Sequence, residues 1–353
     1  MGKASKPQVI VITGSTGFVG SHLVRSLSTD GHHIKAFGRT TKPPKPLLDF
    51  AEYHQWDITE STDNGQHGKA DVFIHTAGFV DFWGKKPDMY QANVVGTQNA
   101  IDLAGKMGAK VFICMSSASV YDPLTDKVDV KESAPYAKRY LNYYAATKAE
   151  AEQLLLENAG FDQTVIIRPH AIYGPGDRTL VPQILSRVKY QRFILPDSGN
   201  AKYSVTHVGN IVDAVRGVLD RQLKGKTIFN ITDDGSIEAK QFLQEVLSRL
   251  DNRVRIVRIP YIIGLTVAYV LEGIAVMTKS SKQPLLTRNI MLQLHKNSTM
   301  DTSLARGLLG YEARYTYSEG LDDTFAWVHS LGTLKGVHAG GARSSWSGDI
   351  KIY

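Results

Sequence analysis

A tyrosine and a lysine stand four residues apart in the segment Tyr144-Ala145-Ala146-Thr147-Lys148. On a helix, this spacing places the two side chains on one face. A free phenol has a pKa of about 10, and a neighbouring ammonium lowers that pKa because it favours the phenolate. The pair is therefore suited to moving a proton to or from a reacting oxygen.

Tyrosines surround this pair, and most rings of that kind serve packing. Tyr136, Tyr140 and Tyr143 lie within the same stretch, but Tyr143 has Thr147 four residues on, not a lysine. A Tyr-x-x-x-Lys spacing is common by chance, so the pair needs support from elsewhere in the chain. A serine pair, Ser116-Ser117, lies upstream and offers hydroxyl groups that hydrogen-bond a reacting oxygen.

A glycine-rich run near the start of the chain predicts a binding place for a dinucleotide. The β-branched residues 9–12 predict a buried parallel strand, and the apolar period of residues 19–27 predicts a helix that closes at Asp30-Gly31. A turn rich in glycine between them allows close approach of a pyrophosphate to the helix N-terminus. The candidate cofactor residues in this turn are Gly14, Ser15, Thr16, Gly17, Phe18, Val19 and Gly20.

The end of the second predicted strand, residues 33–37, bears on which nicotinamide cofactor is used. An acidic residue at this point accepts from the ribose 2′-OH of NAD, whereas this chain continues with Gly38-Arg39-Thr40. A guanidinium binds a 2′-phosphate through paired hydrogen bonds. The sequence therefore favours NADP(H), through Arg39, and leaves NAD(H) open.

Three more predicted strands continue a doubly wound α/β sheet. Residues 53–58 end near Asp57 and Ile58, residues 70–75 lead into Thr76-Ala77-Gly78, and residues 110–115 lead into the serine pair. Ligands of such sheets bind at the carboxyl edge of the strands. The serine pair and the glycine turn are thus expected at one edge.

Taken together, the ordered motifs resemble those of extended short-chain dehydrogenases/reductases, over roughly residues 8 to 330. The motifs are Thr13-Gly14-x-x-Gly17-x-x-Gly20, Asp57-Ile58, His75-Thr76-Ala77-Gly78, Asn93-Val94-x-Gly96-Thr97, Ser116-Ser117-Ala118-Ser119-Val120-Tyr121, Tyr144-x-x-x-Lys148 and Arg168-Pro169-x-x-Ile172-Tyr173-Gly174. Within that superfamily the chain is most similar to the 3β-hydroxysteroid dehydrogenase branch, which includes sterol-carboxylate dehydrogenases and reductases of 2-alkyl-3-oxo acids. Residues 81–84, Asp-Phe-Trp-Gly, and 168–174 point there.

This resemblance implies an NAD(P)(H)-dependent oxidoreductase that interconverts a secondary alcohol and a ketone on an apolar substrate, either a 3-hydroxy/3-oxo steroid or sterol or a long-chain 3-oxo acid. It implies that Tyr144 is the acid/base, that Lys148 also holds the nicotinamide ribose, and that Ser117 positions the reacting oxygen. It extends the cofactor-binding set to Asp57, Ile58, Thr76, Ala77, Gly78, Asn93, Tyr144, Lys148, Pro169 and Ile172. A homodimer is expected from the resemblance alone.

The length of 353 residues suits a Rossmann-type domain with a smaller C-terminal substrate-binding region. We expect the NAD(P)-binding domain at 7–170, an interleaved substrate region at 171–331 and a mobile tail at 332–353. The net charge of +7 is modest, and basic residues are not clustered with aromatic ones, so nucleic acid is not an expected partner. A single cysteine, Cys114, and a start without an apolar signal segment favour a cytoplasmic protein, and no metal site is predicted.

The segment 260–277 is almost wholly apolar and carries one charge, Glu272. Its length is near the lower limit for a membrane span, so a buried or substrate-lining helix is favoured. A helix that lies on a membrane surface, giving peripheral membrane contact, is the alternative.

Two other functions use the same fold. A nucleotide-sugar epimerase or dehydratase would retain its NAD(P) and bind a diphosphate through basic residues. The segment 202–208 lacks the Arg-Asp pairing associated with that branch. A non-catalytic redox sensor would bind only the nucleotide, and such proteins usually lose the tyrosine or the lysine, both of which this chain keeps.

Overall fold

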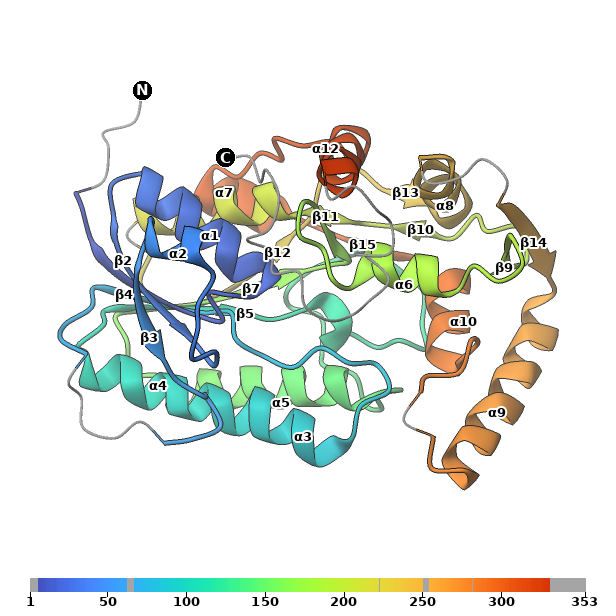
Figure 1. The fold of residues 1–353 in the computed structure, drawn as a ribbon, viewed down its shortest axis with the longest axis horizontal. Coiled ribbons are helices and arrows are strands. Elements are labelled where there is room, and N and C mark those ends of the chain that lie inside the picture. Colours follow the sequence, from blue (N-terminus) through green and yellow to red (C-terminus); the bar gives the residue numbers. More distant parts are fainter. Residues whose placement is uncertain (1–5, 62–66, 222, 250–253, 281, 331–353) are drawn as a thin grey trace.

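The computed structural model describes residues 6–61, 67–221, 223–249, 254–280 and 282–330 (Figure 1). The predicted tail at 332–353 lies outside the described residues. No helix in the described ranges is long and apolar enough to cross a membrane.

A seven-stranded sheet forms the centre of the larger part of the molecule, with the order β3-β2-β1-β4-β5-β7-β12, and every neighbouring pair is parallel. The strand order reverses between β1 and β4, which is where doubly wound sheets bind ligands. Its strands are β1 (Val9–Thr13), β2 (His33–Gly38), β3 (Glu52–Gln55), β4 (Val72–His75), β5 (Val111–Met115), β7 (Gln163–Pro169) and β12 (Gly225–Ile231). The predicted Rossmann-type fold is confirmed.

Helices cover both faces of the sheet, as Figure 1 shows. Ile10 and Ile12 of β1 pack toward α1 (Phe18–Thr29) and α7 (Val208–Asp220). Val11 points to the other face because side chains alternate along a strand, and there it joins a core with α4 (Gly96–Lys106) and α5 (Tyr143–Asn158). The shorter helices nearby are α2 (Lys45–Leu48), α3 (Lys86–Tyr90) and α11 (Ser303–Leu309). A strand buried on two faces thus explains the run of β-branched residues.

The smaller part is built on short strands and its own apolar core. Its sheets have the orders β13-β10-β15-β6, β11-β8 and β14-β9. These strands are β6 (Lys127–Val130), β8 (Ile172–Tyr173), β9 (Arg192–Pro196), β10 (Lys202–Tyr203), β11 (Thr206–His207), β13 (Ile237–Glu238), β14 (Arg255–Ile259) and β15 (Ser298–Met300). The helices are α6 (Leu180–Ser186), α8 (Ala239–Ser248), α9 (Tyr261–Met277), α10 (Arg288–His295) and α12 (Tyr317–Ser330). Because β6 belongs here while α7 and β12 return to the large sheet, the chain crosses between the two parts more than once.

Two predictions about elements need correction. The third strand ends at Gln55, so Asp57 and Ile58 lie in the turn beyond it, not within a strand. The helix predicted at 260–277 forms as α9, but it is buried along only one face. Small residues, Gly264, Ala268 and Ala275, make up its buried positions, and most of its large apolar side chains point outward.

Candidate active site

The glycine turn after β1 has the close packing that a pyrophosphate-binding turn needs. Gly14 has a φ of +68°, and a Cβ there would lie 2.7 Å from the backbone N of Ala77. Gly17 would place a Cβ 2.9 Å from the Gly14 carbonyl oxygen. Helix α1 starts at Phe18, and its first turn contains no acidic residue. The partial positive charge of the helix N-terminus therefore faces a turn without side-chain bulk, which fits a dinucleotide pyrophosphate.

The other residues of this turn contact neighbouring segments and hold the turn in place. The Ser15 hydroxyl donates to the Phe37 carbonyl oxygen at 3.0 Å, which ties the turn to β2. The Thr16 carbonyl oxygen accepts from Nη2 of Arg178 at 3.4 Å. Phe18 contacts the His22 ring edge-on, and Val19 packs on the core. Arg178 was missed by the sequence reasoning, although it lies only four residues beyond the motif at 168–174.

The residues predicted for the adenosine end lie at the ends of β2 and β3. Arg39 is exposed and follows the last residue of β2 directly. The Asp57 carboxylate accepts from the Thr59 backbone N at 2.9 Å and from its hydroxyl at 2.8 Å. Ile58 is buried, and its side chain lies against Gly96. Asp57 is therefore held in a fixed orientation by Thr59.

Beyond β4, the segment 75–78 packs onto the end of β1. His75 is buried between two hydroxyl groups, with Thr13 Oγ1 2.8 Å from Nδ1 and Thr97 Oγ1 3.2 Å from Nε2. The Thr76 hydroxyl donates to the Thr13 carbonyl oxygen at 2.6 Å. Burial and, to a smaller extent, the positive charge of Lys148 lower the pKa of His75 to about 3. A neutral imidazole therefore fastens the two strand ends together.

Asn93 occupies a π-helical turn, η1 (Gln91–Val95), between α3 and α4. Its amide accepts from the Phe79 backbone N at 2.7 Å and donates to the Phe79 carbonyl oxygen at 3.1 Å. The same amide nitrogen donates to the Thr147 hydroxyl at 3.0 Å. The sequence motif at 93–97 did not indicate this widened turn, and such turns are frequent at functional sites. Asn93 thus connects the loop after β4 to α5.

The two adjacent tyrosines at the start of helix α5 differ in exposure to solvent. The Asn142 side chain caps the helix by accepting from the Ala145 backbone N at 2.9 Å. Tyr143 is 50% exposed, whereas Tyr144 is 6% exposed and packs edge-on against Phe82 with ring centroids 5.5 Å apart. The inward tyrosine is thus the one followed by a lysine four residues later.

Lys148 lies where the strand ends meet α5. Its Nζ donates to the Met115 carbonyl oxygen, at the last residue of β5, at 2.8 Å. A Cβ on Gly78 would lie 3.6 Å from the same Nζ. The ammonium is therefore next to the residues predicted to contact the cofactor and one helical turn from Tyr144.

The structure gives the two serines after β5 different surroundings. The Ser116 hydroxyl is buried and donates to the Glu152 carboxylate. Ser117 is half-buried, and its Oγ accepts from the Ser119 backbone N at 3.1 Å as the cap of the short helix η2 (Ala118–Val120). That bond uses an acceptor position of Ser117 and not its hydroxyl proton, which suits donation to a reacting oxygen.

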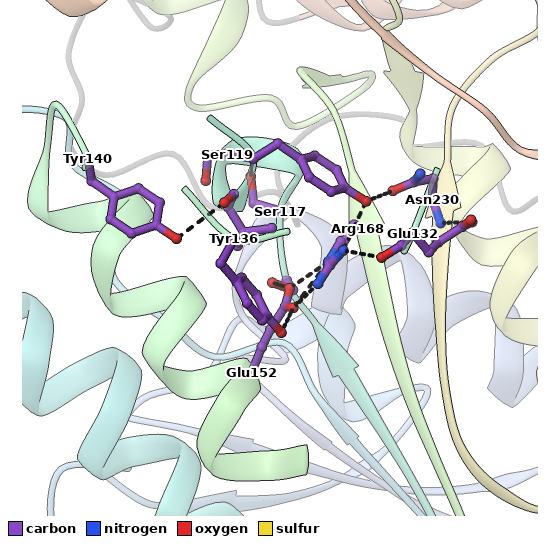
Figure 2. Close-up of polar contacts among 11 residues, drawn as sticks. Ser117, Ser119, Glu132, Tyr136, Tyr140, Glu152, Arg168 and Asn230 are labelled. Carbon is purple, nitrogen blue, oxygen red and sulfur yellow. Dashed lines mark hydrogen bonds and ion pairs between the residues drawn. The ribbon is translucent and has the colours of Figure 1, made fainter. Parts of the chain in front are cut away.

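A buried ionic network lies beneath Ser117, as Figure 2 shows. Glu152 follows Lys148 by one helical turn, and its carboxylate accepts from Arg168 Nε at 3.0 Å and from the Tyr136 hydroxyl at 2.9 Å. Arg168 Nη1 donates to the Tyr121 hydroxyl at 2.9 Å, which in turn donates to Asn230 at 2.8 Å. The carboxylate and burial raise the pKa of Tyr136. The sequence reasoning missed this network. The one available signal was Glu152 itself, which stands four residues after Lys148 and so lies on the same face of the helix.

The last two predicted cofactor residues, Pro169 and Ile172, lie at and just beyond the end of β7, on either side of His170. Pro169 is the final residue of β7, and Ile172 lies in β8, where it packs on the apolar core that includes α1 and α7. Nδ1 of His170 lies 2.5 Å from the Ser204 carbonyl oxygen and Nε2 lies 3.1 Å from the Ser298 hydroxyl. Burial lowers the pKa of His170 to about 4. His170 is thus a buried histidine with a partner for each ring nitrogen.

Comparison with known proteins supports what this geometry indicates. The model of the NAD dependent epimerase/dehydratase family matches residues 10–232. The chain belongs to this family. It is an NAD(P)-dependent dehydrogenase/reductase acting on CH-OH groups, in the branch of extended short-chain dehydrogenases/reductases that resembles 3β-hydroxysteroid dehydrogenases.

Two relatives and one solved structure are similar to this chain. The chain is 30% identical to 3beta-hydroxysteroid-dehydrogenase/decarboxylase isoform 1 of Arabidopsis thaliana, over 92% of this chain and 80% of that protein. It is 28% identical to a 2-alkyl-3-oxoalkanoate reductase of Shewanella oneidensis, over 90% of this chain and 86% of that protein. The solved structure of UDP-Glucuronic acid 4-epimerase from Bacillus cereus in complex with NAD has a TM-score of 0.68 at 20% identity, covering 94% of this chain and 100% of that one, and supports the fold.

Proposed function

We propose that this family member is an NADP(H)-dependent enzyme that interconverts a secondary alcohol and a ketone on an apolar substrate. The substrate classes proposed are 3-hydroxy or 3-oxo steroids or sterols, and long-chain 3-oxo acids. The observation that carries the proposal is the inward-facing Tyr144, which shares one face of α5 with Lys148 beside the end of β5.

In the direction of ketone reduction, a nicotinamide cofactor held by the glycine turn and Lys148 would supply hydride to the carbonyl carbon. The Tyr144 hydroxyl donates its proton to the oxygen, on which negative charge develops. The Ser117 hydroxyl donates a hydrogen bond to the same oxygen and orients it. The Lys148 ammonium stabilises the phenolate that Tyr144 becomes, because opposite charges attract strongly in a site with little water.

The surroundings of Tyr144 support an apolar substrate. Phe82 packs against the Tyr144 ring. Phe79 and Val80, in the same loop, are exposed although they are apolar. The names of two relatives, a 3beta-hydroxysteroid-dehydrogenase/decarboxylase and a 2-alkyl-3-oxoalkanoate reductase, describe substrates of this apolar kind.

The preference for NADP(H) rests on the end of β2. Arg39 is an exposed cation at the position where an acidic residue would bind the ribose 2′-OH of NAD. A guanidinium there has the geometry to bind a 2′-phosphate.

A nucleotide-sugar epimerase or dehydratase is the second candidate, because a solved structure of the same fold is a UDP-sugar epimerase in complex with NAD. We would titrate purified protein with NADPH and NADH and then measure turnover on a 3-oxosteroid, a long-chain 3-oxo acid and a UDP-sugar. Oxidation of NADPH by either apolar ketone supports the reductase. Conversion of the UDP-sugar with retained cofactor, and no net oxidation of NADPH, contradicts it.

A further inference from the structure

Helix α9 exposes a continuous apolar face to solvent. Among its outward residues Ile262 is 75% exposed and Met277, at the other end, is 76% exposed. The further large apolar residues exposed along the helix are Ile263, Val267, Tyr269, Val270, Ile274 and Val276. An apolar patch of this extent on a protein surface marks a place of contact with another molecule or a membrane.

The opposite face of α9 is fixed to the rest of the protein. Ala268 is buried in a small core with Leu286 and Met291, the latter from α10. The ring of Tyr261 stacks on His295 with centroids 3.8 Å apart. Figure 1 shows α9 at the end of the molecule remote from α1 and α2, with α10 on its inner side. The apolar face is therefore held outward by folded structure.

Charges near α9 have a consistent pattern. Glu272, the one charged residue within the helix, is paired with Arg288, whose Nε lies 2.6 Å from its carboxylate. Asp197 accepts from the Tyr261 backbone N at 2.9 Å and pairs with His295 at 2.8 Å. Both of these carboxylates are thus matched by a positive partner or a backbone donor.

Among the residues that the structure describes, basic side chains without an ion-pair partner lie at both ends of α9. Before the helix, Arg255 and Arg258 of β14 line a cavity of about 560 Å³ together with Lys240 of α8. Leu247, Val254 and Ile256 supply apolar wall to the same cavity. After the helix, Lys279 and Lys282 are both exposed. An apolar face bounded by cations is complementary to a bilayer with anionic headgroups, because acyl chains and negative phosphates lie at adjacent depths.

The apolar face also connects to the candidate active site. The indole nitrogen of Trp83 donates to the Ser280 carbonyl oxygen, just past the end of α9, at 3.2 Å. Phe82, the preceding residue, packs on Tyr144. A single loop therefore joins the end of α9 to the catalytic helix.

We propose that α9 docks this protein on the surface of a bilayer that contains anionic lipid, with its outer face in the headgroup–acyl boundary. The cations at both ends contact lipid phosphates. The docked orientation brings the loop at 79–83 to the membrane, the source of an apolar substrate. The docking itself is independent of which substrate is turned over.

The test is co-sedimentation of the full chain with two kinds of vesicle, one of phosphatidylcholine alone and one in which phosphatidylserine replaces a third of it. We expect the protein to bind the second kind and to be released by raised salt, because charges near a surface are screened. The double variant Val270→Asp/Ile274→Asp should lose binding. The matched control, Leu304→Asp/Leu308→Asp, changes two exposed leucines at the same spacing on α11 and should bind like the parent.

A second pair of variants tests the cations. Arg258→Ala/Lys279→Ala should weaken binding by about fivefold for each basic residue removed, whereas Lys45→Ala/Lys110→Ala, at exposed positions on the Rossmann part, should not. Circular dichroism and the urea midpoint establish that each variant is folded.

Two outcomes overturn the proposal. One is retention of vesicle binding by the α9 aspartate variant while it is folded. The other is an absence of vesicle binding by the folded parent. In that case, a dimer, measured by light scattering, that the α9 variant converts to monomer would show that a second copy covers α9. Turnover measured without vesicles reports separately on the proposed function.

Discussion

The Glu152 carboxylate and the Arg168 guanidinium form a buried ion pair directly below the serine segment, with side chains 1% and 2% exposed. One partner belongs to α5, which carries Tyr144 and Lys148, and the other to β7. The Ser116 hydroxyl donates to the same carboxylate. The pair therefore fixes the catalytic helix to β7, and the Ser116 hydrogen bond ties the same carboxylate to the segment after β5 that carries Ser117.

Removal of this carboxylate should destabilise the protein. Glu152→Ala leaves the Arg168 charge buried without its partner, which costs about 3–5 kcal/mol of the free energy of unfolding. Urea denaturation measures the change. The control is Glu150→Ala, at an exposed position on the same helix, and we expect less than about 0.5 kcal/mol there. Equal stabilities of the two variants would show that the pair has no such role.

Tyr144→Phe tests the proton donor. Loss of the hydroxyl should lower kcat by roughly 10²- to 10⁴-fold, the contribution typical of general acid–base catalysis. The Kd of NADPH should stay nearly unchanged, because the ring and its contact with Phe82 remain. Tyr143→Phe is the matched control at the exposed neighbour. Activity of Tyr144→Phe close to that of the parent would refute Tyr144 as the acid/base.

Arg39→Asp tests the cofactor preference. A lost charge-assisted hydrogen bond to a 2′-phosphate should weaken NADPH binding by roughly 10- to 100-fold, and the new carboxylate should favour NADH. Fluorescence titration with each cofactor gives the ratio of the two Kd values. Lys45→Asp, an exposed charge change six residues further along, controls for net charge. If the ratio of the two Kd values is unchanged, Arg39 does not select NADP(H), and NAD(H) becomes the favoured cofactor.

Acid should weaken the fold through buried histidines. Burial lowers the pKa of His75 to about 3 and those of His22 and His170 to about 4. Below the ordinary value of 6.5 the unfolded chain takes up these protons and the folded chain does not, so stability falls as the pH falls from 6.5 toward 4. Burial raises the pKa of Asp177 and Asp233 to about 6, which acts in the opposite direction between 3.8 and 6. The stability lost through the three histidines exceeds the stability gained through the two aspartates, so the free energy of unfolding decreases in acid.

The variant His170→Asn makes this dependence measurable. It should reduce the slope of the free energy of unfolding against pH by up to about 1.4 kcal/mol per pH unit in the acid range. The exposed His33→Asn should leave the slope as it is. A parent whose stability is constant from about pH 7 to about pH 4.5 would contradict the argument.

Local patterns were enough to predict much of the fold and the candidate site. The β-branched run at 9–12, the glycine turn and the helical period after it correspond to β1 and α1 within a residue or two. The spacing of Tyr144 and Lys148 placed both on one helix face, and that helix exists. These predictions succeed because hydrogen bonding between nearby residues and side-chain periodicity are properties of a short segment.

Other features depended on contacts between distant segments. The sequence contained nothing that turned Tyr144 inward and Tyr143 outward; packing against Phe82 decided this. The separation of Ser116 from Ser117 depended on Glu152, 36 residues away, and the widened turn at Asn93 on its bonds to Phe79 and Thr147. The outward face of α9 likewise followed from which residues α10 covers.

By itself, the sequence determined the family, the order of the first five strands of the large sheet and the identity of the residues with suitable chemistry, since each is encoded in local spacing. The tertiary structure alone decided which of those side chains share a site, which are committed to the buried Glu152–Arg168 network and which apolar surface is left uncovered. The physical reason is that burial and pairing depend on what the rest of the folded chain places beside a residue, and no local pattern contains that information.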